Sequence, residues 1–317
     1  MKIGILDGYT LFQSDLSWKE LDSFGEVIYQ DRKGPDGIHS ALLEAEVLIT
    51  NKFVLDGHNI PSFPHLKLII VSATGYNCVD LSVCQSRNIQ VCNVPNYGTF
   101  SVAQHALALL LDYSNGVAVH ADAVSNGEWV NSKDWCFQKS TIIELMHKKM
   151  GIIGMGAIGK AFANMCLSLG MQVSYSHTKD LNLPNMAFRS LEDLAKESDF
   201  ISLHCPLTPQ TNHLIDKFFL ANAKKNLVVI NTSRGGLIQA QDLADALNNG
   251  QIAAALLDVL EVEPPAANNP LLSAKNTRIT PHNAWISFEA RSRIFETVKL
   301  IVENYSKQQP LPNKLIF

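Results

Sequence analysis

Short runs of apolar residues alternate with stretches of helical periodicity along most of the chain. The runs stand at 2–7, 26–30, 46–50, 66–73 and 89–94 in the first part, and at 150–154, 172–176, 200–205, 226–232, 254–259 and 278–280 in the second. They are too uniformly apolar for strands with one face in water, as is typical of parallel sheets covered by helices on both sides. The pattern predicts an α/β protein with two doubly wound parallel sheets.

The two sets of predicted strands are separated by a long segment without strand character. Residues 98–124 have helical spacing and no proline, which predicts one long helix with Thr99 or Ser101 as N-cap. Residues 125–148 are irregular, and irregular segments of this length are usually functional or form an interface. Because this region is apolar and contains Trp129 and Trp135, we expect it to build a homodimer. A final helix is predicted within 286–307.

Composition narrows the class of protein. A chain of 317 residues is natural for two domains. The net charge of −4 argues against nucleic acid or an acidic membrane surface as a partner, and no apolar run approaches the ~20 residues of a membrane span. The six cysteines form no C-x-x-C pair and no zinc spacing, so we expect reduced thiols, a cytoplasmic location and no bound metal.

A glycine-rich turn, GIIGMGAIGK at 151–160, follows one predicted strand and opens a helix. Gly154, Gly156 and Gly159 have the spacing of the dinucleotide fingerprint, and a second strand follows the helix. Glycines there allow a tight turn, a close approach of the backbone to pyrophosphate, and close packing of helix on strand. The turn therefore predicts a dinucleotide site in which Met155, Ala157 and Ile158 complete the phosphate-binding loop.

The end of the strand at 172–176 is where such folds place an acid that binds the adenosine ribose and repels a 2′-phosphate. Here the sequence continues with His177, Thr178 and Lys179, and Asp180 comes late for that position. Either the ribose contacts come from elsewhere, or His177 and Thr178 accept a phosphorylated ribose. We expect NAD as the main cofactor and leave NADP open.

Three later runs end in polar residues. Arg234 follows the run at 226–232, Asp258 and Glu263 follow the run at 254–259, and His282 follows the run at 278–280. Ligands of open parallel sheets bind at the carboxyl ends of the strands, so these side chains are expected at the same edge as the glycine turn. A guanidinium binds a carboxylate in bidentate fashion, an imidazole exchanges a proton, and a neighbouring carboxylate orients it. Arg234, Glu263 and His282 are the predicted catalytic residues.

Five blocks, GIIGMGAIG, HCPLTPQTNHLI, VVINTSRGGLI, AALLDVLEVEPP and ITPHNAW, resemble in order and spacing those of the D-isomer-specific 2-hydroxyacid dehydrogenases. The resemblance implies that Arg234 binds the substrate carboxylate and that Glu263 pairs with His282, the acid/base. It also implies that Arg234 and His282 border the cofactor, together with Cys205, Pro206, Thr211, Thr232 and, at the nicotinamide carboxamide, Asp258.

In this family the cofactor domain is inserted into the substrate domain. The resemblance therefore implies a flavodoxin-like substrate domain from 1–97 and 284–317, and a Rossmann NAD(P)-binding domain at 98–283. The active site is expected in the cleft between them.

The segment at 71–81, VSATGYNCVDL, bears on the substrate. Ala73, Thr74 and Gly75 form a small-residue loop whose backbone N–H groups suit a carboxylate, and Asn51 and Lys52 follow another strand end. Whether Lys52 contacts substrate or is an ordinary exposed lysine is left open.

The motifs ATGYN-x-VD, NVP-x-YGT-x-SVAQH and HNAWIS-x-EAR are most similar to those of bacterial glycerate dehydrogenases, also called hydroxypyruvate reductases. The implied activity is reversible reduction of a small 2-oxo acid, hydroxypyruvate or glyoxylate, to the D-2-hydroxy acid. A D-lactate-type dehydrogenase and an NAD-sensing, corepressor-like binding protein on the same fold are the alternatives. A phosphoglycerate dehydrogenase is disfavoured, because the loop at 72–77 lacks basic residues for a second anionic group.

Overall fold

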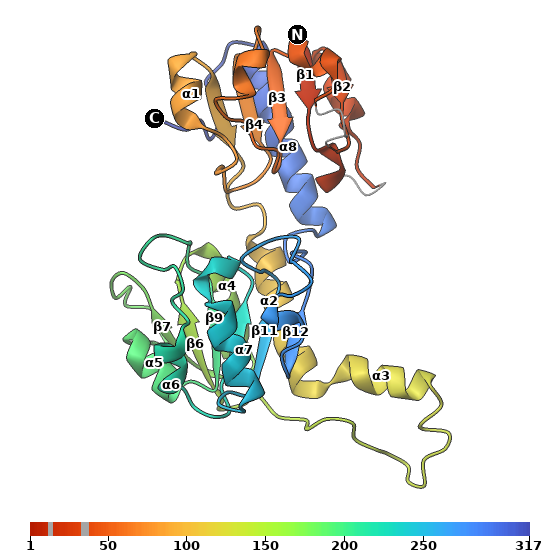
Figure 1. Ribbon diagram of the computed structural model, residues 1–317, viewed down its shortest axis with the longest axis vertical. Helices are drawn as coiled ribbons and strands as arrows, with labels where there is room; N and C mark the ends of the chain where they lie inside the picture. The colour runs from red at the N-terminus through yellow and green to blue at the C-terminus, as the bar shows by residue number, and fades with distance from the viewer. Residues whose placement is uncertain (12–14, 33–37) are drawn as a thin grey trace. The chain divides into compact units, whose positions relative to one another are not determined.

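The computed structural model describes residues 1–11, 15–32 and 38–317. The chain forms two compact units (Figure 1). The terminal unit comprises Met1–Gly98 and Ile286–Phe317, and the central unit comprises Thr99–Trp285. The boundaries expected from the sequence lie within two residues of these.

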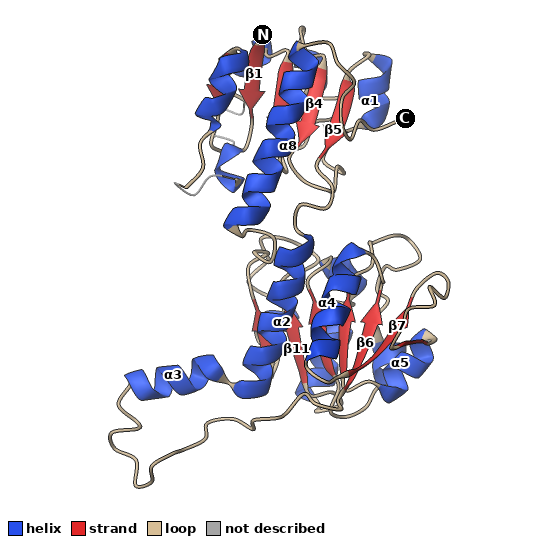
Figure 2. Cartoon of the chain, turned by 180° about the vertical axis from the view of Figure 1, so that it is seen from behind, coloured by secondary structure: helices blue, strands red, loops and turns tan. Residues whose placement is uncertain are grey.

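The terminal unit contains a five-stranded parallel sheet with the order β2-β1-β3-β4-β5, which is the flavodoxin-like order. Its strands are β1 Lys2–Ile5, β2 Glu26–Tyr29, β3 Val47–Thr50, β4 Leu68–Val71 and β5 Gln90–Asn93. Every residue of β3 and β4 is buried, as expected when both faces of a sheet are covered. The long helix α8, Phe288–Ser306, runs across one face and begins where the Ser287 hydroxyl accepts the Ala290 N–H (Figure 2). The short helix α1, Leu81–Ser86, precedes β5.

The central unit contains a seven-stranded parallel sheet with the order β12-β11-β10-β9-β6-β7-β8. Its strands are β6 Lys149–Ile153, β7 Gln172–Ser176, β8 Met186–Phe188, β9 Phe200–Leu203, β10 Val228–Asn231, β11 Ala254–Leu257 and β12 Thr277–Ile279. Counted within the unit, six of the strands follow the Rossmann order 3-2-1-4-5-6 and β12 extends it. The predicted fold class is confirmed. Only β8 was not predicted, because it is a three-residue edge strand with no fully buried position.

Helices cover both faces of the central sheet. On one face lie α2, Thr99–Asn115, and α4, Ala157–Ser168, which Figure 2 shows in front of the strands. On the other face lie α5 Leu191–Glu197, α6 Lys217–Ala221 and α7 Ala240–Asn248 (Figure 1). No helix among the described residues combines the length and the apolar character that crossing a bilayer requires.

The prediction of one long helix at 98–124 is wrong. α2 ends at Asn115, Gly116 adopts the left-handed conformation at φ +60°, and a second helix, α3, covers Val117–Ser125. A Cβ at position 116 would lie 2.4 Å from the Ser140 hydroxyl, so the break also needs a residue without a side chain. Ser101 is not an N-cap, because its hydroxyl donates to the Ala284 carbonyl oxygen.

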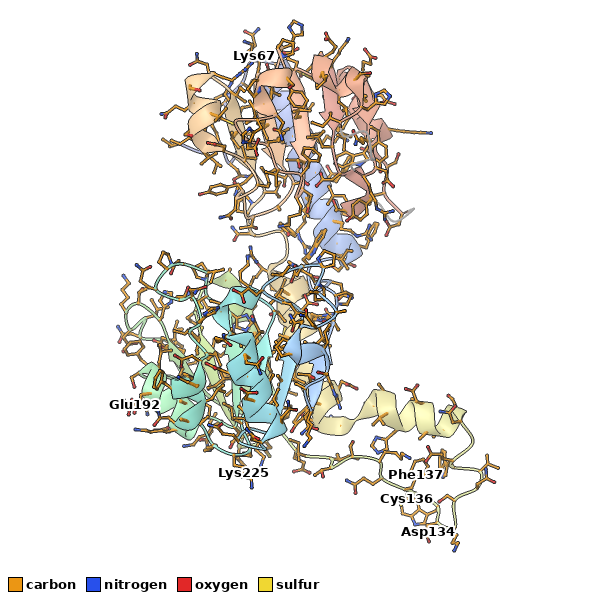
Figure 3. The ribbon with its side chains drawn as sticks, in the orientation of Figure 1. Lys67, Asp134, Cys136, Phe137, Glu192 and Lys225 are labelled. Carbon is orange, nitrogen blue, oxygen red and sulfur yellow. The ribbon has the colours of Figure 1, made fainter. Side chains whose placement is uncertain are left out.

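The segment from α3 to residue 142, which we call the arm, extends away from the central sheet (Figures 1 and 3). After α3 it contains no helix or strand, as predicted, and Asp134, Cys136 and Phe137 lie near its tip (Figure 3). Its exposed apolar side chains are Val117, Val119, Val124, Trp129, Val130, Trp135 and Ile142.

Candidate active site

The glycine turn joins β6 to α4 with no room for side chains at two of its three positions. Gly154 has φ +96°, and a Cβ there would lie 2.5 Å from the backbone nitrogen of Cys205. A Cβ on Gly159 would lie 2.1 Å from the Gly154 carbonyl oxygen. A Cβ on Gly156 would meet nothing within 4 Å. The first and third glycines are therefore required by packing, whereas the second faces open space.

That open space lies in front of the N-terminus of α4. Gly156 is the N-cap residue, and no side chain caps the helix. The first N–H groups of α4 are thus available to an anion, and the positive end of the helix dipole adds to their attraction. The turn fits the pyrophosphate of a dinucleotide.

The end of β7 presents His177 to this turn. Its Nδ1 accepts the backbone N–H of Met155 at 3.4 Å. Asp180 lies nearby in sequence, but its carboxylate accepts the Tyr175 hydroxyl at 2.5 Å and the Asn182 N–H at 2.8 Å. These hydrogen bonds lower the pKa of Asp180. Asp180 is therefore engaged with β7. His177, the residue after this strand, stands at the position where an acid was expected.

The remaining predicted cofactor residues follow β9 and β10. Burial raises the pKa of the Cys205 thiol, which favours the uncharged form beside the glycine turn. The Thr211 hydroxyl donates to the Pro206 carbonyl oxygen at 2.7 Å and thereby closes its own loop. The Thr232 hydroxyl is buried and has no hydrogen-bond partner in the part of the chain that the structure describes. A buried hydroxyl without a partner is costly unless a ligand satisfies it.

Arg234 follows β10 and begins a short 3-10 turn at Gly235–Leu237. Its guanidinium is exposed, and Nη1 donates to the Ser233 carbonyl oxygen at 2.7 Å. The Asn231 side chain donates to the Arg234 carbonyl oxygen at 2.9 Å. Gly235 packs so closely that a Cβ would lie 1.9 Å from the carbonyl carbon of Leu260. The loop after β10 is thereby seated against the loop after β11.

His282 and Glu263 form the predicted pair. Nδ1 of His282 lies 2.5 Å from Oε2 of Glu263, while Oε1 accepts the Leu260 N–H at 2.9 Å. The carboxylate is therefore held in place and favours the proton on Nδ1 in the neutral imidazole. His282 itself has φ +53°, and its N–H lies 2.8 Å from the Asp258 carbonyl oxygen. Nε2 makes no hydrogen bond to the described residues, so it is available to exchange a proton.

The side chain of Asp258 is only 1% exposed and binds the loop that contains His282. Oδ1 accepts the Thr280 hydroxyl at 2.6 Å and the Asn283 N–H at 3.0 Å, and Oδ2 accepts the Ala284 N–H at 2.9 Å. The imidazole of His105, on α2, bonds to Thr280 at 3.0 Å. The family resemblance implies that Asp258 is a cofactor ligand. In the structure its carboxylate also accepts hydrogen bonds from the loop at 280–284.

The predicted substrate loop lies in the terminal unit. The backbone N–H groups of Ala73, Thr74 and Gly75 donate to no group among the described residues. Asn51 is buried and its amide donates to the Ser72 carbonyl oxygen at 2.8 Å, whereas the side chain of Lys52 is exposed. Within the described chain, the loop thus has three unbonded backbone N–H groups, and the Asn51 amide binds its main chain at Ser72.

The structure thus gathers the candidate residues into two groups. Arg234, Glu263 and His282 follow the adjacent strands β10, β11 and β12, at the same edge of the central sheet as the glycine turn. Ala73–Gly75, Asn51 and Lys52 lie at the carboxyl edge of the terminal sheet, after β4 and β3.

Residues 107–284 match the family model for the D-isomer specific 2-hydroxyacid dehydrogenase NAD binding domain. The chain belongs to the D-isomer-specific 2-hydroxyacid dehydrogenases. It is 42% identical over 317 residues to a hydroxypyruvate reductase of Blautia hydrogenotrophica, with 98% of each chain covered. It is 37% identical to a glyoxylate reductase of Thermococcus litoralis, over 93% of this chain and 92% of that one. The crystal structure of the TT0316 protein from Thermus thermophilus is similar over the full length of both chains, with 31% identity and a TM-score of 0.86.

Three polar residues next to the candidate site were not identified from the sequence. Asn283 has a buried Oδ1 without a partner among the described residues, next to His282. His105 and Thr280 complete the network around Asp258. The ITPHNAW motif contains Thr280 and Asn283, so attention to polar residues flanking the histidine would have found them; His105, 175 residues from Thr280, gave no such signal.

Gly156→Ala provides a test of the glycine turn. Its methyl group would meet no protein atom, so the free energy of unfolding should fall by at most about 1 kcal/mol, the cost of a poorer N-cap. Binding of NADH should weaken at least tenfold, because the methyl group occupies space in front of α4. Fluorescence titration with NADH and urea denaturation measure the two effects.

Gly159→Ala is the matched control, since its Cβ would collide with the Gly154 carbonyl oxygen. The Gly159→Ala variant should lose stability as well as affinity for NADH. Unchanged NADH affinity in Gly156→Ala would mean that the open space before α4 does not receive the pyrophosphate.

Proposed function

We propose that this dehydrogenase reduces a small 2-oxo acid, hydroxypyruvate or glyoxylate, to the D-2-hydroxy acid and catalyses the reverse reaction. The observation that carries the proposal is the Glu263–His282 pair, which leaves Nε2 unbonded at the same sheet edge as Arg234 and the glycine turn. The names of the relatives from Blautia hydrogenotrophica and Thermococcus litoralis support the two substrates.

Each catalytic residue has a distinct role in the proposal. Arg234 binds the substrate carboxylate through its planar guanidinium and polarises the adjacent carbonyl. Reduced nicotinamide, when bound, supplies a hydride to the carbonyl carbon. His282 donates the proton from Nε2 to the carbonyl oxygen, so that hydride and proton together complete the alcohol. Glu263 orients the imidazole and stabilises its charged form through Nδ1.

The backbone N–H groups of Ala73, Thr74 and Gly75 are proposed as a second contact for the substrate carboxylate. Turnover with hydroxypyruvate or glyoxylate and either NADH or NADPH tests the proposal directly. A protein that binds NADH but turns over no 2-oxo acid would favour the corepressor-like alternative.

Variants of the acid/base pair test the mechanism. His282→Gln should lower kcat by roughly 10²–10⁴ with near-normal NADH affinity, the usual size of a lost general acid. Glu263→Gln removes the charge that stabilises the imidazolium. Because reduction needs the protonated ring, reductase activity of that variant should be lost at a lower pH than in the wild type.

The measurement is kcat/KM for hydroxypyruvate as a function of pH. Glu261→Gln, two residues away and paired instead with His213 at 3.3 Å, is the control. An identical pH profile for Glu263→Gln and the wild type would remove Glu263 from the mechanism.

We propose NAD as the main cofactor, with weak discrimination against NADP. His177, Thr178 and Lys179 offer no negative charge to a 2′-phosphate, and Asp180 is engaged with Tyr175. His177→Asp should therefore penalise NADPH by at least about tenfold, or about 1.4 kcal/mol, and spare NADH. Comparing kcat/KM for both cofactors in wild type and variant decides it. Wild-type rejection of NADPH by a thousandfold would place selectivity in other residues.

We further propose a homodimer formed through the arm, in a protein of the cytoplasm. Val130 and Trp135 have exposed fractions of 89% and 86%, and single chains rarely leave so much apolar surface in water. All six cysteines are free thiols, as is usual in reducing compartments.

Substituting glutamate for Val130 and Trp135 together should dissociate the dimer, because a partner would have to bury two charges. Sedimentation velocity at micromolar concentration measures the change. Phe218→Glu, an equally disruptive change at an exposed position of α6 outside the arm, should leave the dimer intact. An active 35.0 kDa monomer in the wild type would contradict the proposal.

A further inference from the structure

In the loop after β4, the carbonyl oxygens are hydrogen-bonded to described residues but the N–H groups are not. The N–H groups of Ala73, Thr74 and Gly75 have no acceptor among the described residues, yet the carbonyl oxygens of three consecutive residues, 72 to 74, all accept hydrogen bonds. Such a loop offers these three donors to a ligand, whereas three of its carbonyl oxygens are already engaged, and it therefore favours anions over cations.

Two buried asparagine side chains produce this state. Nδ2 of Asn51, after β3, donates to the Ser72 carbonyl oxygen at 2.8 Å. Nδ2 of Asn93, at the end of β5, donates to the Thr74 carbonyl oxygen at 2.8 Å. Between them, the Val94 N–H donates to the Ala73 carbonyl oxygen at 3.0 Å. The strands on both sides of β4 thus bind its carboxyl-terminal loop.

Engaging a carbonyl oxygen also orients the following N–H group. In a planar trans peptide, the C=O of one residue and the N–H of the next point in opposite directions. The bond from Asn93 to Thr74 therefore turns the Gly75 N–H away from β5, and the bond from Val94 to Ala73 turns the Thr74 N–H the same way. The bond from Asn51 to Ser72 turns the Ala73 N–H away from β3. Each asparagine controls the direction of one donor.

Asn51 is itself held in place by a carboxylate. Oδ1 of Asp7 accepts the Asn51 N–H at 2.7 Å, and Oδ2 accepts the Lys52 and Phe53 N–H groups at 2.6 and 2.9 Å. The Asp7 side chain thus occupies the donors of the loop after β3. An anionic ligand meets free backbone donors at the loop after β4 and not at its neighbour.

We infer that Asn51 and Asn93 are positioning residues, which hold the main chain of the loop at 73–75 so that the N–H groups of Thr74 and Gly75, on one side of it, receive the carboxylate of the 2-oxo acid. The inference rests on the proposed function, and it explains why these two polar side chains are buried. Preorganised donors of this kind bind a developing or resident charge without the cost of reorienting at the moment of binding.

The test is a comparison of three single substitutions, Asn51→Ala, Asn93→Ala and Asn93→Asp. Each should raise KM for hydroxypyruvate about tenfold or more, change kcat by less than about threefold, and leave KM for NADH unchanged. Asn93→Asp should have the largest effect, because its carboxylate repels the Thr74 carbonyl oxygen. The dissociation constant of oxamate, an unreactive carboxylate, should rise in parallel when measured by calorimetry on the NADH-bound enzyme.

Asn304→Ala is the matched control. Asn304 lies on α8 in the same unit, and its Nδ2 also donates to a main-chain carbonyl oxygen, that of Pro310 at 2.8 Å. It should change neither KM nor oxamate binding. Urea midpoints for all four variants separate a loss of stability from a loss of positioning.

Two results would overturn the inference. One is that both alanine variants keep KM and the oxamate dissociation constant within twofold of wild type, whatever their stability. The other is that KM for NADH rises as much as KM for hydroxypyruvate. A wild type that binds oxamate but reduces no 2-oxo acid would instead refute the proposed function and leave the anion-binding role of the loop intact.

Discussion

A carboxylate buried at the end of a strand needs hydrogen-bond donors, and in this dehydrogenase Asp258 obtains them from the loop that contains His282. With its side chain almost fully buried, Asp258 accepts a hydroxyl and two backbone N–H groups from residues 280 to 284. The hydrogen bonds that this buried carboxylate accepts hold the backbone of the loop in place, including the left-handed conformation of His282. The imidazole then lies at 2.5 Å from Glu263, and its other nitrogen has no hydrogen bond to the residues that the structure describes. The geometry of the Glu263–His282 pair thus depends on the hydrogen bonds of Asp258.

In the terminal unit, buried side chains also bind the main chain just after a strand, but there the side chains donate the hydrogen bonds and the main chain accepts them. In the central unit a carboxylate engages N–H groups and thereby fixes a side chain. In the terminal unit, amide donors of Asn51 and Asn93 engage carbonyl oxygens and leave N–H groups for a ligand. Both arrangements sit at the carboxyl ends of parallel strands, where the ladder ends and main-chain groups need new partners. The buried side chains thus decide which main-chain groups are left without a partner among the described residues.

The predicted cofactor site differs from the usual dinucleotide-binding pattern at one position, the end of β7. The strand end that would present an acid to the ribose presents His177, and its Nδ1 accepts a hydrogen bond from the glycine turn itself. The nearest acid, Asp180, binds the hydroxyl of Tyr175, a fully buried residue of β7. Asp180 therefore helps to stabilise the end of the sheet, and His177 is the first residue after β7.

The sequence by itself determined the two sheets, the glycine turn and the residues of the catalytic pair. Apolar runs covered by helices on both sides leave a periodicity that can be read without a structure, and Gly154, Gly156, Arg234 and His282 belong to local motifs. Only the tertiary structure decided the break at Gly116, the edge strand β8 and the partners of Asp258, Asn51 and Asn93. Those features depend on contacts between distant residues, such as Ser140 beside Gly116 or Asn51 beside Ser72. A hydrogen bond across 21 residues leaves no period in the sequence, because it requires only that two strands end side by side.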